Sequence, residues 1–87
     1  MGRDIRIVVL QRGWVLVGEY WRGGDNCELR KAVVIRRWGT KKGLGEITTG
    51  PLKDTVCDPC GTVRFHILGE IMSIEASDAG WTPVCPA

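Results

Sequence analysis

The first 38 residues contain three segments with the residue pattern of β-strands, at residues 4–10, 14–21 and 27–38, separated only by short turns. Apolar and charged residues alternate along the start of the first segment, and the third segment has apolar residues on both of its expected faces. Gly13 in the first turn and the RGGDN sequence of residues 22–26 in the second favour tight chain reversals. Strands connected this closely must be antiparallel, because a parallel connection needs about a dozen residues or more. The pattern therefore predicts an antiparallel meander.

The amino-acid composition supports a β fold for the whole chain. Val, Ile and Thr number 22 of the 87 residues, whereas Ala numbers 4. β-branched side chains pack well on a pleated sheet, and Ala is the strongest helix former. A chain of this length forms one small domain with a small core, so a homo-oligomer is expected because association adds buried area.

The second half contains two further strand patterns, at residues 62–67 and 70–75, with a bend at Gly69. Residues 39–50 are rich in glycine and allow at most one helical turn, near 44–47. Residues 51–61 favour an irregular crossing with a turn at 58–61. Five strands predict an all-β domain over residues 1–76: a small, partly open SH3-like or OB-like barrel, or a twisted antiparallel sheet. Residues 77–87, with Trp81 and Cys85, are expected to form a tail that lies over the domain or is loose.

Strand alternation also predicts which residues of 27–38 share a face. One face is expected to hold Leu29, Val33 and Ile35, and the other Ala32, Val34 and Trp38. Arg36 falls on the face of Val34 and Trp38. Apolar residues on both faces indicate a strand in the interior of the sheet.

Charge is divided unevenly along the chain. Residues 1–43 hold ten Lys and Arg against four Asp and Glu, a net charge of +6, and residues 44–87 hold two against six, a net charge of −4. This division fits an anion site on the basic half, the docking of one subunit on another, or ordinary solvated charge. The total of +2 is too small for a strong non-specific DNA-binding protein, so nucleic acid is the less favoured partner.

The densest group of chemically active residues is RRWGTKKGLGE at 36–46, which joins four cations, a tryptophan and three glycines. Backbone N–H groups of such a loop can converge on an oxyanion, Arg binds phosphate, and Trp can stack on a base. The sequence does not match the phosphate-loop pattern, and a flexible connection with solvated charges is the alternative. The predicted ligand-binding residues are Arg36, Arg37, Trp38, Thr40, Lys41, Lys42, Gly43 and Gly45, completed by Thr62 and Arg64 on the following strand.

The cysteines and the single histidine give little support for catalysis or for metal binding. Cys57 and Cys60 form one Cys-x-x-Cys pair, but Cys27 and Cys85 are scattered, and a zinc site is usually built from two close pairs. The N-terminal residues lack the pattern of a secretory signal, so free thiols in a reducing compartment are expected. His66 is the single histidine, and no Ser or Cys lies in a recognisable motif for a catalytic nucleophile. We expect a non-enzyme with no metal and no cofactor.

Three segments carry a resemblance to a known family: VIRRWGTKKGLGE at 34–46 with the following Gly50-Pro51, DPCGTVRFH at 58–66, and the opening IVVLQRGWVLVGEY at 7–20. Over residues 5–75 the chain resembles a family of short uncharacterised proteins encoded by tailed phages and prophages. The resemblance implies a phage origin and action in the host cytoplasm, and it implies no mechanism. Small phage proteins of this kind often inhibit or sequester a host component.

Two functions from different classes follow as hypotheses. In the first, a small β oligomer binds a host nucleotide signal without chemistry and so lowers its free concentration. In the second, an interaction protein docks on a host protein or on nucleic acid through Trp14, Trp21 and the basic half, because Trp is enriched at binding hot spots. No apolar run approaches the ~18 residues of a membrane-spanning helix, so no membrane partner is expected.

Overall fold

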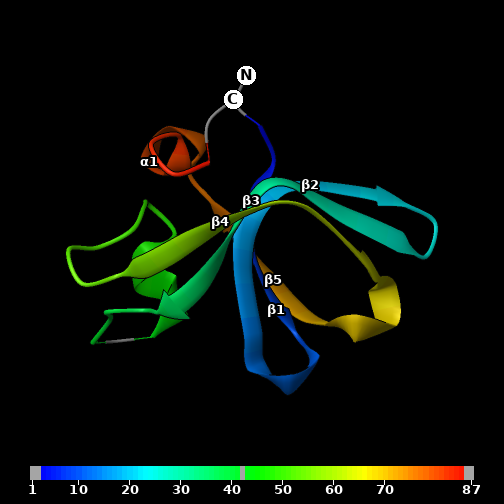
Figure 1. The fold of residues 1–87 in the computed structure, drawn as a ribbon, viewed down its shortest axis with the longest axis horizontal. Helices are drawn as coiled ribbons and strands as arrows, with labels where there is room; N and C mark the ends of the chain where they lie inside the picture. The colour runs from blue at the N-terminus through cyan, green and yellow to red at the C-terminus, as the bar shows by residue number, and fades with distance from the viewer. Residues whose placement is uncertain (1–2, 42, 86–87) are drawn as a thin grey trace.

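The computed structural model describes residues 3–41 and 43–85, and their main element is one five-stranded antiparallel sheet (Figure 1). The strand order is β4-β3-β2-β1-β5. The strands are β1 (Ile5–Leu10), β2 (Trp14–Gly23), β3 (Asn26–Arg37), β4 (Val56–His66) and β5 (Glu70–Ala76). Short 3-10 turns, η1 (Gln11–Gly13), η2 (Leu44–Ile47) and η3 (Ile67–Gly69), and one helix, α1 (Asp78–Trp81), complete the fold. The all-β class expected from the composition is confirmed.

The sheet is an open one. In the described part of the chain, β4 pairs only with β3 and β5 pairs only with β1, so the two edge strands are not joined and no closed barrel forms. β1, β2 and β3 form the predicted meander, with Leu10 opposite Trp14 at one hairpin and Gly23 opposite Asn26 at the other. Among the described helices, none is long and apolar enough to cross a membrane.

The prediction for residues 51–61 is wrong in its second half. β4 begins at Val56, so the residues expected to form a turn, including Pro59, lie within a strand. Pro is tolerated there because β4 is an edge strand, where one side of the backbone needs no ladder hydrogen bond. The pairing of β3 with β4 contains three register shifts, and Gly61 has a φ of 75°. At these bulges β4 accommodates, within a strand, the residues whose sequence suggested a turn.

The expected faces of β3 are also partly wrong. Leu29 packs in the same cluster as Ala32, whereas Val33 and Ile35 pack on the opposite side of the sheet. Lys31, which lies between Leu29 and Ala32, has a φ of 54°. Near this residue the pairing of β3 shifts register with both of its neighbours, β2 and β4. A bulge of this kind reverses the alternation of every later residue. Strict alternation across residues 27–38 therefore failed at Lys31.

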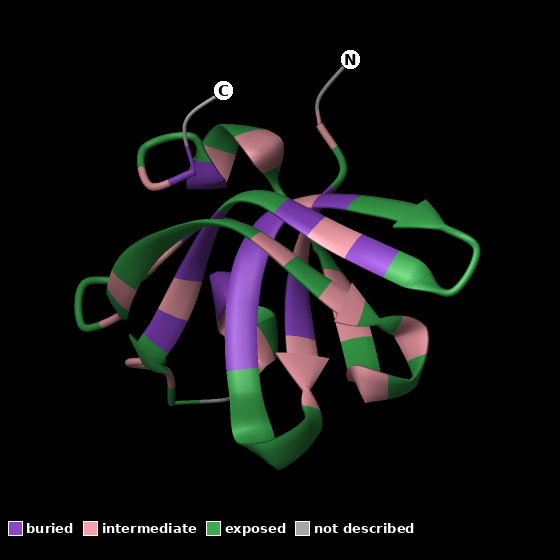
Figure 2. Ribbon diagram, turned by 45° about the vertical axis from the view of Figure 1, so that its right-hand side comes forward, coloured by how far each residue is buried: buried purple, intermediate pink, exposed green. Residues whose placement is uncertain are grey.

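Two apolar clusters lie on the two sides of the curved sheet. The first contains residues of β1, β2 and β3 together with η2 and the C-terminal segment: Ile5, Ile7, Val15, Val17, Val33, Ile35, Ile47, Trp81 and Cys85. The second contains Val8, Leu16, Tyr20, Cys27, Leu29 and Ala32. Buried residues accordingly run along the middle of the central strands (Figure 2). The apolar residues on both faces of the central strands are therefore covered within the single chain.

The C-terminal segment lies over the domain, which was one of the two alternatives expected for it. Trp81 and Cys85 are fully buried, and the Trp81 indole Nε1–H donates to the Ile47 carbonyl at 2.9 Å. α1 approaches the chain after η2 so closely that a Cβ at Gly80 would collide with the Thr49 carbonyl. Glycine is therefore required at position 80.

Contacts from the two ends of the chain fix this arrangement. The Ser77 hydroxyl caps α1 by accepting from the N–H of Gly80 at 3.1 Å. Arg3 forms an ion pair with Asp78, Nε to Oδ1 2.9 Å, and its backbone N–H donates to Asp78 Oδ2 at 2.8 Å. These hydrogen bonds from Arg3 lower the pKa of Asp78. The segment after β5 thus belongs to the same packed unit as the sheet.

Candidate functional site

The segment predicted to bind an anion, residues 36–46, comprises the end of β3 and the turn after it, and we call it the glycine-rich loop. Several of its predicted ligand-binding groups make contacts within the chain itself. Arg36 pairs with Asp58 of β4, Nη1 to Oδ2 3.1 Å. The backbone N–H of Lys41 donates to the Glu46 carboxylate, at 3.0 Å to Oε2 and 3.4 Å to Oε1. An internal carboxylate therefore occupies the position where an external oxyanion was expected. Lys42 lies outside the described residues.

The other predicted loop residues surround this turn. Trp38 is exposed, and its carbonyl accepts a hydrogen bond from the Thr55 hydroxyl at 2.6 Å. Arg37 is exposed opposite Val56, and Thr40 is half-buried. Gly43 has a φ of 99° and precedes η2, which contains Gly45. Arg36 shares a face with Val34, as expected, because Asp58 lies directly opposite Val34.

Thr62 and Arg64 do not lie beside this loop. In the pairing of β3 with β4, Asp58 is opposite Val34 near the loop, and Arg64 is opposite Glu28 toward the other end of β3. Six residues of strand separate Asp58 from Arg64, a distance of roughly 20 Å. The nine predicted residues that the structure describes therefore form no single pocket, and Arg64 belongs to a different surface.

That surface is a groove of about 620 Å³ on β2, β3 and β4. Its volume lies within the ~300–1,000 Å³ typical of small-molecule sites. We call it the β2–β4 groove, and it is lined by Trp21, Arg22, Gly23, Asn26, Cys27, Glu28, Arg30, Arg64 and Phe65.

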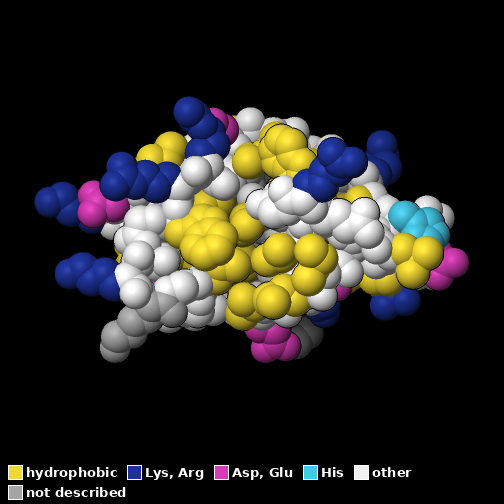
Figure 3. Space-filling view, turned by 90° about the horizontal axis from the view of Figure 1, so that it is seen from below, with side chains coloured by type: hydrophobic (Ala, Val, Ile, Leu, Met, Phe, Trp, Pro, Cys, Tyr) yellow, Lys and Arg dark blue, Asp and Glu magenta, His cyan; other side chains and the backbone are white. Residues whose placement is uncertain are grey.

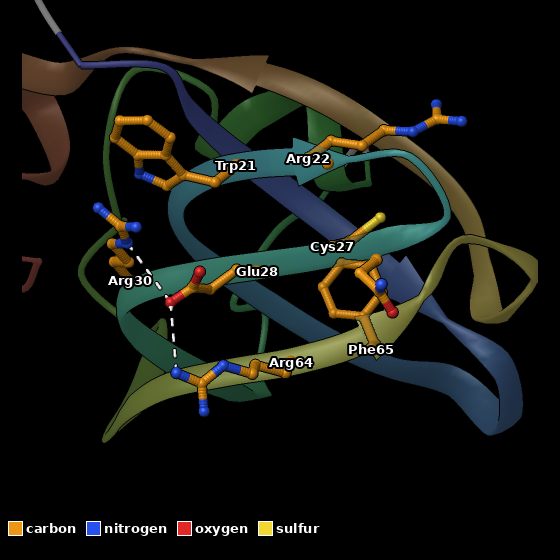
Figure 4. Close-up of a pocket in the computed structure, with 9 residues that line it drawn as sticks. Trp21, Arg22, Cys27, Glu28, Arg30, Arg64 and Phe65 are labelled. Carbon is orange, nitrogen blue, oxygen red and sulfur yellow. Dashed lines mark hydrogen bonds and ion pairs between the residues drawn. The ribbon is translucent and has the colours of Figure 1, made fainter.

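The side chains of the β2–β4 groove form a connected group (Figure 4). The guanidinium carbon of Arg30 lies 4.2 Å from the centroid of the Trp21 ring, within the range of a cation–π interaction. Glu28 Oε1 lies 3.4 Å from Arg30 Nε and 3.9 Å from Arg64 Nη2. Arg22 points away from the group and donates from Nε to the Gly24 carbonyl at 2.9 Å. Two guanidinium groups therefore lie beside one carboxylate, and an indole ring packs against one of the two guanidinium groups.

Strand register explains why these side chains meet. Trp21 is opposite Glu28 across β2 and β3, and Glu28 is opposite Arg64 across β3 and β4. Directly opposite residues place their side chains on the same face, about 4.5–5.5 Å apart at Cβ. Arg30 reaches the same face because it lies two residues after Glu28. Sequence reasoning missed the groove because it treated Trp21 and Arg30 as separate strand residues. Pairing the strands outward from the GGDN turn aligns Trp21 with Glu28 and places Arg30 on the same face.

The groove has the chemistry of a site for an anion that carries a planar ring. Arg64 is 80% exposed in its side chain, and its ion pair with Glu28 is long, so an incoming phosphate can engage it. Exposed ion pairs contribute only ~0–1 kcal/mol, so replacing Glu28 by a ligand oxyanion costs little. The Arg30 guanidinium lies over the Trp21 ring, and a base can stack on a guanidinium plane as it does on an aromatic ring.

A second hollow, of about 360 Å³, lies between the sheet and the C-terminal segment. It is lined by Val33, Cys57, Pro59, Pro83 and Val84, none of which is charged. It therefore lacks a group that would hold an anion. Neither hollow is lined by a residue of the glycine-rich loop.

The four cysteines are free thiols in the structure. Burial raises the pKa of Cys57 and of Cys60, and it raises the pKa of Cys85 to about 11. These three thiols stay protonated at neutral pH, whereas the thiolate is the nucleophile and metal ligand. His66 has a local role, since its Nδ1 accepts from the N–H of Leu68 at 3.1 Å and caps η3. Among residues 3–41 and 43–85, no three His, Cys, Asp or Glu side chains gather as metal ligands would.

Replacing the thiols of the Cys-x-x-Cys pair should have small effects. Cys60 is exposed and its Sγ–H donates weakly to the Ala32 carbonyl at 3.4 Å, while Cys57 packs at the margin of the first cluster. We expect Cys60→Ser and Cys57→Ser each to change the free energy of unfolding by about 1 kcal/mol or less, with Cys57 the more sensitive. Urea unfolding measures both values. Unfolding of the parent protein by a zinc chelator would contradict the assignment of structural thiols.

Comparison with known proteins gave no match: no family model matches the chain, and neither a curated protein nor a solved structure does.

Proposed function

We propose that the protein is a non-enzymatic binding protein that holds a nucleotide in the β2–β4 groove. The observation that supports this most directly is the grouping of Arg30 and Arg64 beside Glu28, with Trp21 packed on Arg30, in a groove of about 620 Å³. A nucleotide is the common biological anion with a planar ring. Arg64 binds the phosphate in this proposal, and the stacked Trp21–Arg30 pair supports the base.

The biological role proposed for this binding is sequestration. A protein that binds a host nucleotide signal and does not convert it lowers the free concentration of that signal. The resemblance of residues 5–75 to small phage and prophage proteins favours such a role, and action in the host cytoplasm is part of the same proposal. The groove, rather than the glycine-rich loop, is favoured because the loop already directs a backbone N–H to Glu46 and pairs Arg36 with Asp58.

Thermal unfolding with a panel of mono-, di- and cyclic nucleotides tests this function. A ligand that binds only the folded state raises the melting temperature. At a ligand concentration a hundred times the Kd, the free energy of unfolding increases by ~2.7 kcal/mol. We expect an increase for one class of nucleotide and recovery of that nucleotide chemically unchanged. No increase for any nucleotide, or conversion of the bound nucleotide to a product, would contradict the proposal.

Neutralising Glu28 should strengthen binding. Its carboxylate competes with a ligand phosphate for Arg30 and Arg64, from which it lies 3.4 and 3.9 Å. We expect Glu28→Gln to lower the Kd for the stabilising nucleotide about three- to tenfold, since removal of a nearby like charge favours the bound anion. Isothermal titration calorimetry measures the change. Glu75→Gln is the matched control, an exposed carboxylate on β5 outside the groove lining. Weaker binding by Glu28→Gln would show instead that the carboxylate contacts the ligand directly.

The second candidate is an interaction protein that docks on a host protein. The observation in its favour is the exposure of large apolar side chains, including Trp14, Leu68, Ile71 and Met72. A pull-down from host lysate, with retention abolished by Trp14→Ala, would support this alternative. The nucleotide panel distinguishes the two, because docking on a protein through these residues needs no nucleotide.

A further inference from the structure

The β2–β4 groove contains an asparagine side chain whose hydrogen-bonding groups are unused. Asn26, the first residue of β3, lines the groove and is exposed. Among the residues that the structure describes, none forms a hydrogen bond with its side-chain amide. A carboxamide has one acceptor oxygen and two N–H donors. All of these groups are available to a ligand in the groove.

Strand register places Asn26 on the same face of the sheet as the charged residues of the groove. Glu28 is opposite Trp21 on β2 and opposite Arg64 on β4, and Asn26 precedes Glu28 by two residues. Neither pairing shifts register within residues 26–29 of β3. Side chains two residues apart on a regular strand share a face. The Asn26 amide is therefore on the side of the sheet where a ligand at Trp21 and Arg64 would lie.

The position across from Asn26 is empty. Gly23 is directly opposite Asn26 and follows Trp21 by two residues, so a side chain at position 23 would stand on this same face. No atom of the described residues lies within 4 Å of the place where its Cβ would be. Directly opposite residues have Cβ positions about 4.5–5.5 Å apart. A flat ring can therefore lie over Gly23, with Trp21 along the strand and the Asn26 amide across it.

This combination separates the groove from other apolar surface of the molecule. Figure 3 shows hydrophobic side chains gathered across the side of the molecule seen from below. Exposed apolar side chains alone give a flat ring no fixed orientation, because a few polar groups supply orientation and specificity in ligand sites. In the groove an indole, a guanidinium and an unused amide, from Trp21, Arg64 and Asn26, lie on one face of three neighbouring strands.

The chemistry of the amide favours adenine among the bases. A carboxamide pairs with a ring edge on which a donor lies beside an acceptor. In adenine the 6-amino donor has a ring-nitrogen acceptor on each side, N1 and N7, so both edges of the base fit the amide. The N7 edge of guanine has two acceptors and does not fit. Cytosine has a ring nitrogen on only one side of its amino group, and its single ring stacks over a smaller area.

We propose that Asn26 determines base specificity in the β2–β4 groove and that the ligand is an adenine nucleotide. The base lies over Gly23 beside Trp21, Asn26 Oδ1 accepts from the 6-amino group, and Asn26 Nδ2–H donates to the adjacent ring nitrogen. Neighbouring strands are ~4.8 Å apart, so ~10 Å separates Trp21 on β2 from Arg64 on β4, and one nucleotide can place its base at the first and its phosphate at the second. This inference rests on the proposed function, nucleotide binding in the groove.

Calorimetric titration with adenosine 5′-monophosphate and purine riboside 5′-monophosphate tests the assignment, because the two ligands differ only in the 6-amino group. We expect the parent protein to bind the adenine nucleotide about tenfold or more tightly, within the range for a bidentate contact to a base. In Asn26→Ala the two ligands should bind equally. Gln11→Ala removes an exposed amide outside the groove and should keep the preference of the parent. Circular dichroism checks that each variant keeps the fold.

A second variant tests the position of the base. Gly23→Leu fills the empty position and should abolish detectable binding of adenosine 5′-monophosphate. Gly69→Leu is the matched control, because a Cβ there also meets no atom within 4 Å and Gly69 lies outside the groove lining. Neither glycine has a positive φ, so the backbone accepts leucine at both positions.

The outcomes separate this inference from the proposed function. Equal affinity of the parent for the two ligands, a preference unchanged in Asn26→Ala, tighter binding of guanosine 5′-monophosphate, or undiminished binding by Gly23→Leu would each overturn the adenine assignment. If nucleotide binding nevertheless depends on Arg64 and Trp21, the proposed function stands without it. No binding of any nucleotide would overturn both.

Discussion

Replacing Trp81 with alanine should lower the free energy of unfolding by ~3–5 kcal/mol, the usual cost of removing a buried tryptophan. Trp81 is fully buried in the first cluster, and its indole N–H donates to the Ile47 carbonyl at 2.9 Å, so the variant also leaves a buried carbonyl without its donor. Domains are stable by only ~5–15 kcal/mol, and a domain this small lies toward the lower end. Urea unfolding followed by circular dichroism measures the change.

Trp38→Ala provides the control for this prediction. Trp38 is exposed at the end of β3 and belongs to neither apolar cluster, so its removal should cost less than about 1 kcal/mol. Equal, small effects for Trp81 and Trp38 would show that residues 78–85 do not contribute to the core.

Substitutions in the β2–β4 groove should have the largest effects on binding. Arg64→Ala should weaken binding of the stabilising nucleotide about tenfold or more, because a hydrogen bond to a charged group contributes ~1.5–3 kcal/mol. Trp21→Ala should weaken it to a similar extent, since stacking contributes ~1–3 kcal/mol per base. Calorimetric titration measures both, and neither change should unfold the protein because both side chains are substantially exposed.

Arg36→Ala and Trp38→Ala are matched controls for these variants. They remove the same two residue types from the glycine-rich loop, where Arg36 pairs with Asp58. We expect both to bind the nucleotide as well as the parent does. Loss of binding in these two variants, with binding retained in Arg64→Ala and Trp21→Ala, would locate the ligand at the loop.

Local sequence patterns predicted most of the sheet. The alternation of residues 4–10, the turn at Gly13 and the single turn of helix at 44–47 all correspond to observed elements, β1, η1 and η2. The errors arose where the backbone departs from regular strand geometry. Pro59 lies in an edge strand that tolerates it, and Lys31 adopts a positive φ that no local pattern indicates. Both depend on tertiary pairing, which one strand's sequence does not specify.

The candidate site was less predictable than the fold for the same reason. The cluster of cations at 36–42 is conspicuous in the sequence, but Arg36 is paired with Asp58, which lies 22 residues later in the chain. Trp21, Glu28 and Arg64 are scattered in the sequence and meet only through the register of three strands. Arg64, predicted as a companion of the loop, contributes to the groove instead. A site assembled from different strands follows from pairing, and pairing is a non-local property.

The most direct test of the groove as ligand site is a nuclear magnetic resonance titration that follows the four tryptophan indole N–H signals, assigned from single Trp→Phe variants. Trp21 lies in the groove, Trp38 in the glycine-rich loop, Trp81 in the core and Trp14 at the β1–β2 hairpin. Saturation with the nucleotide that raises the melting temperature should shift the Trp21 signal and the side-chain Nε–H signals of Arg30 and Arg64, and leave that of Trp38 unchanged. A shift of Trp38 with Trp21 unchanged would contradict the assignment of the ligand to the β2–β4 groove.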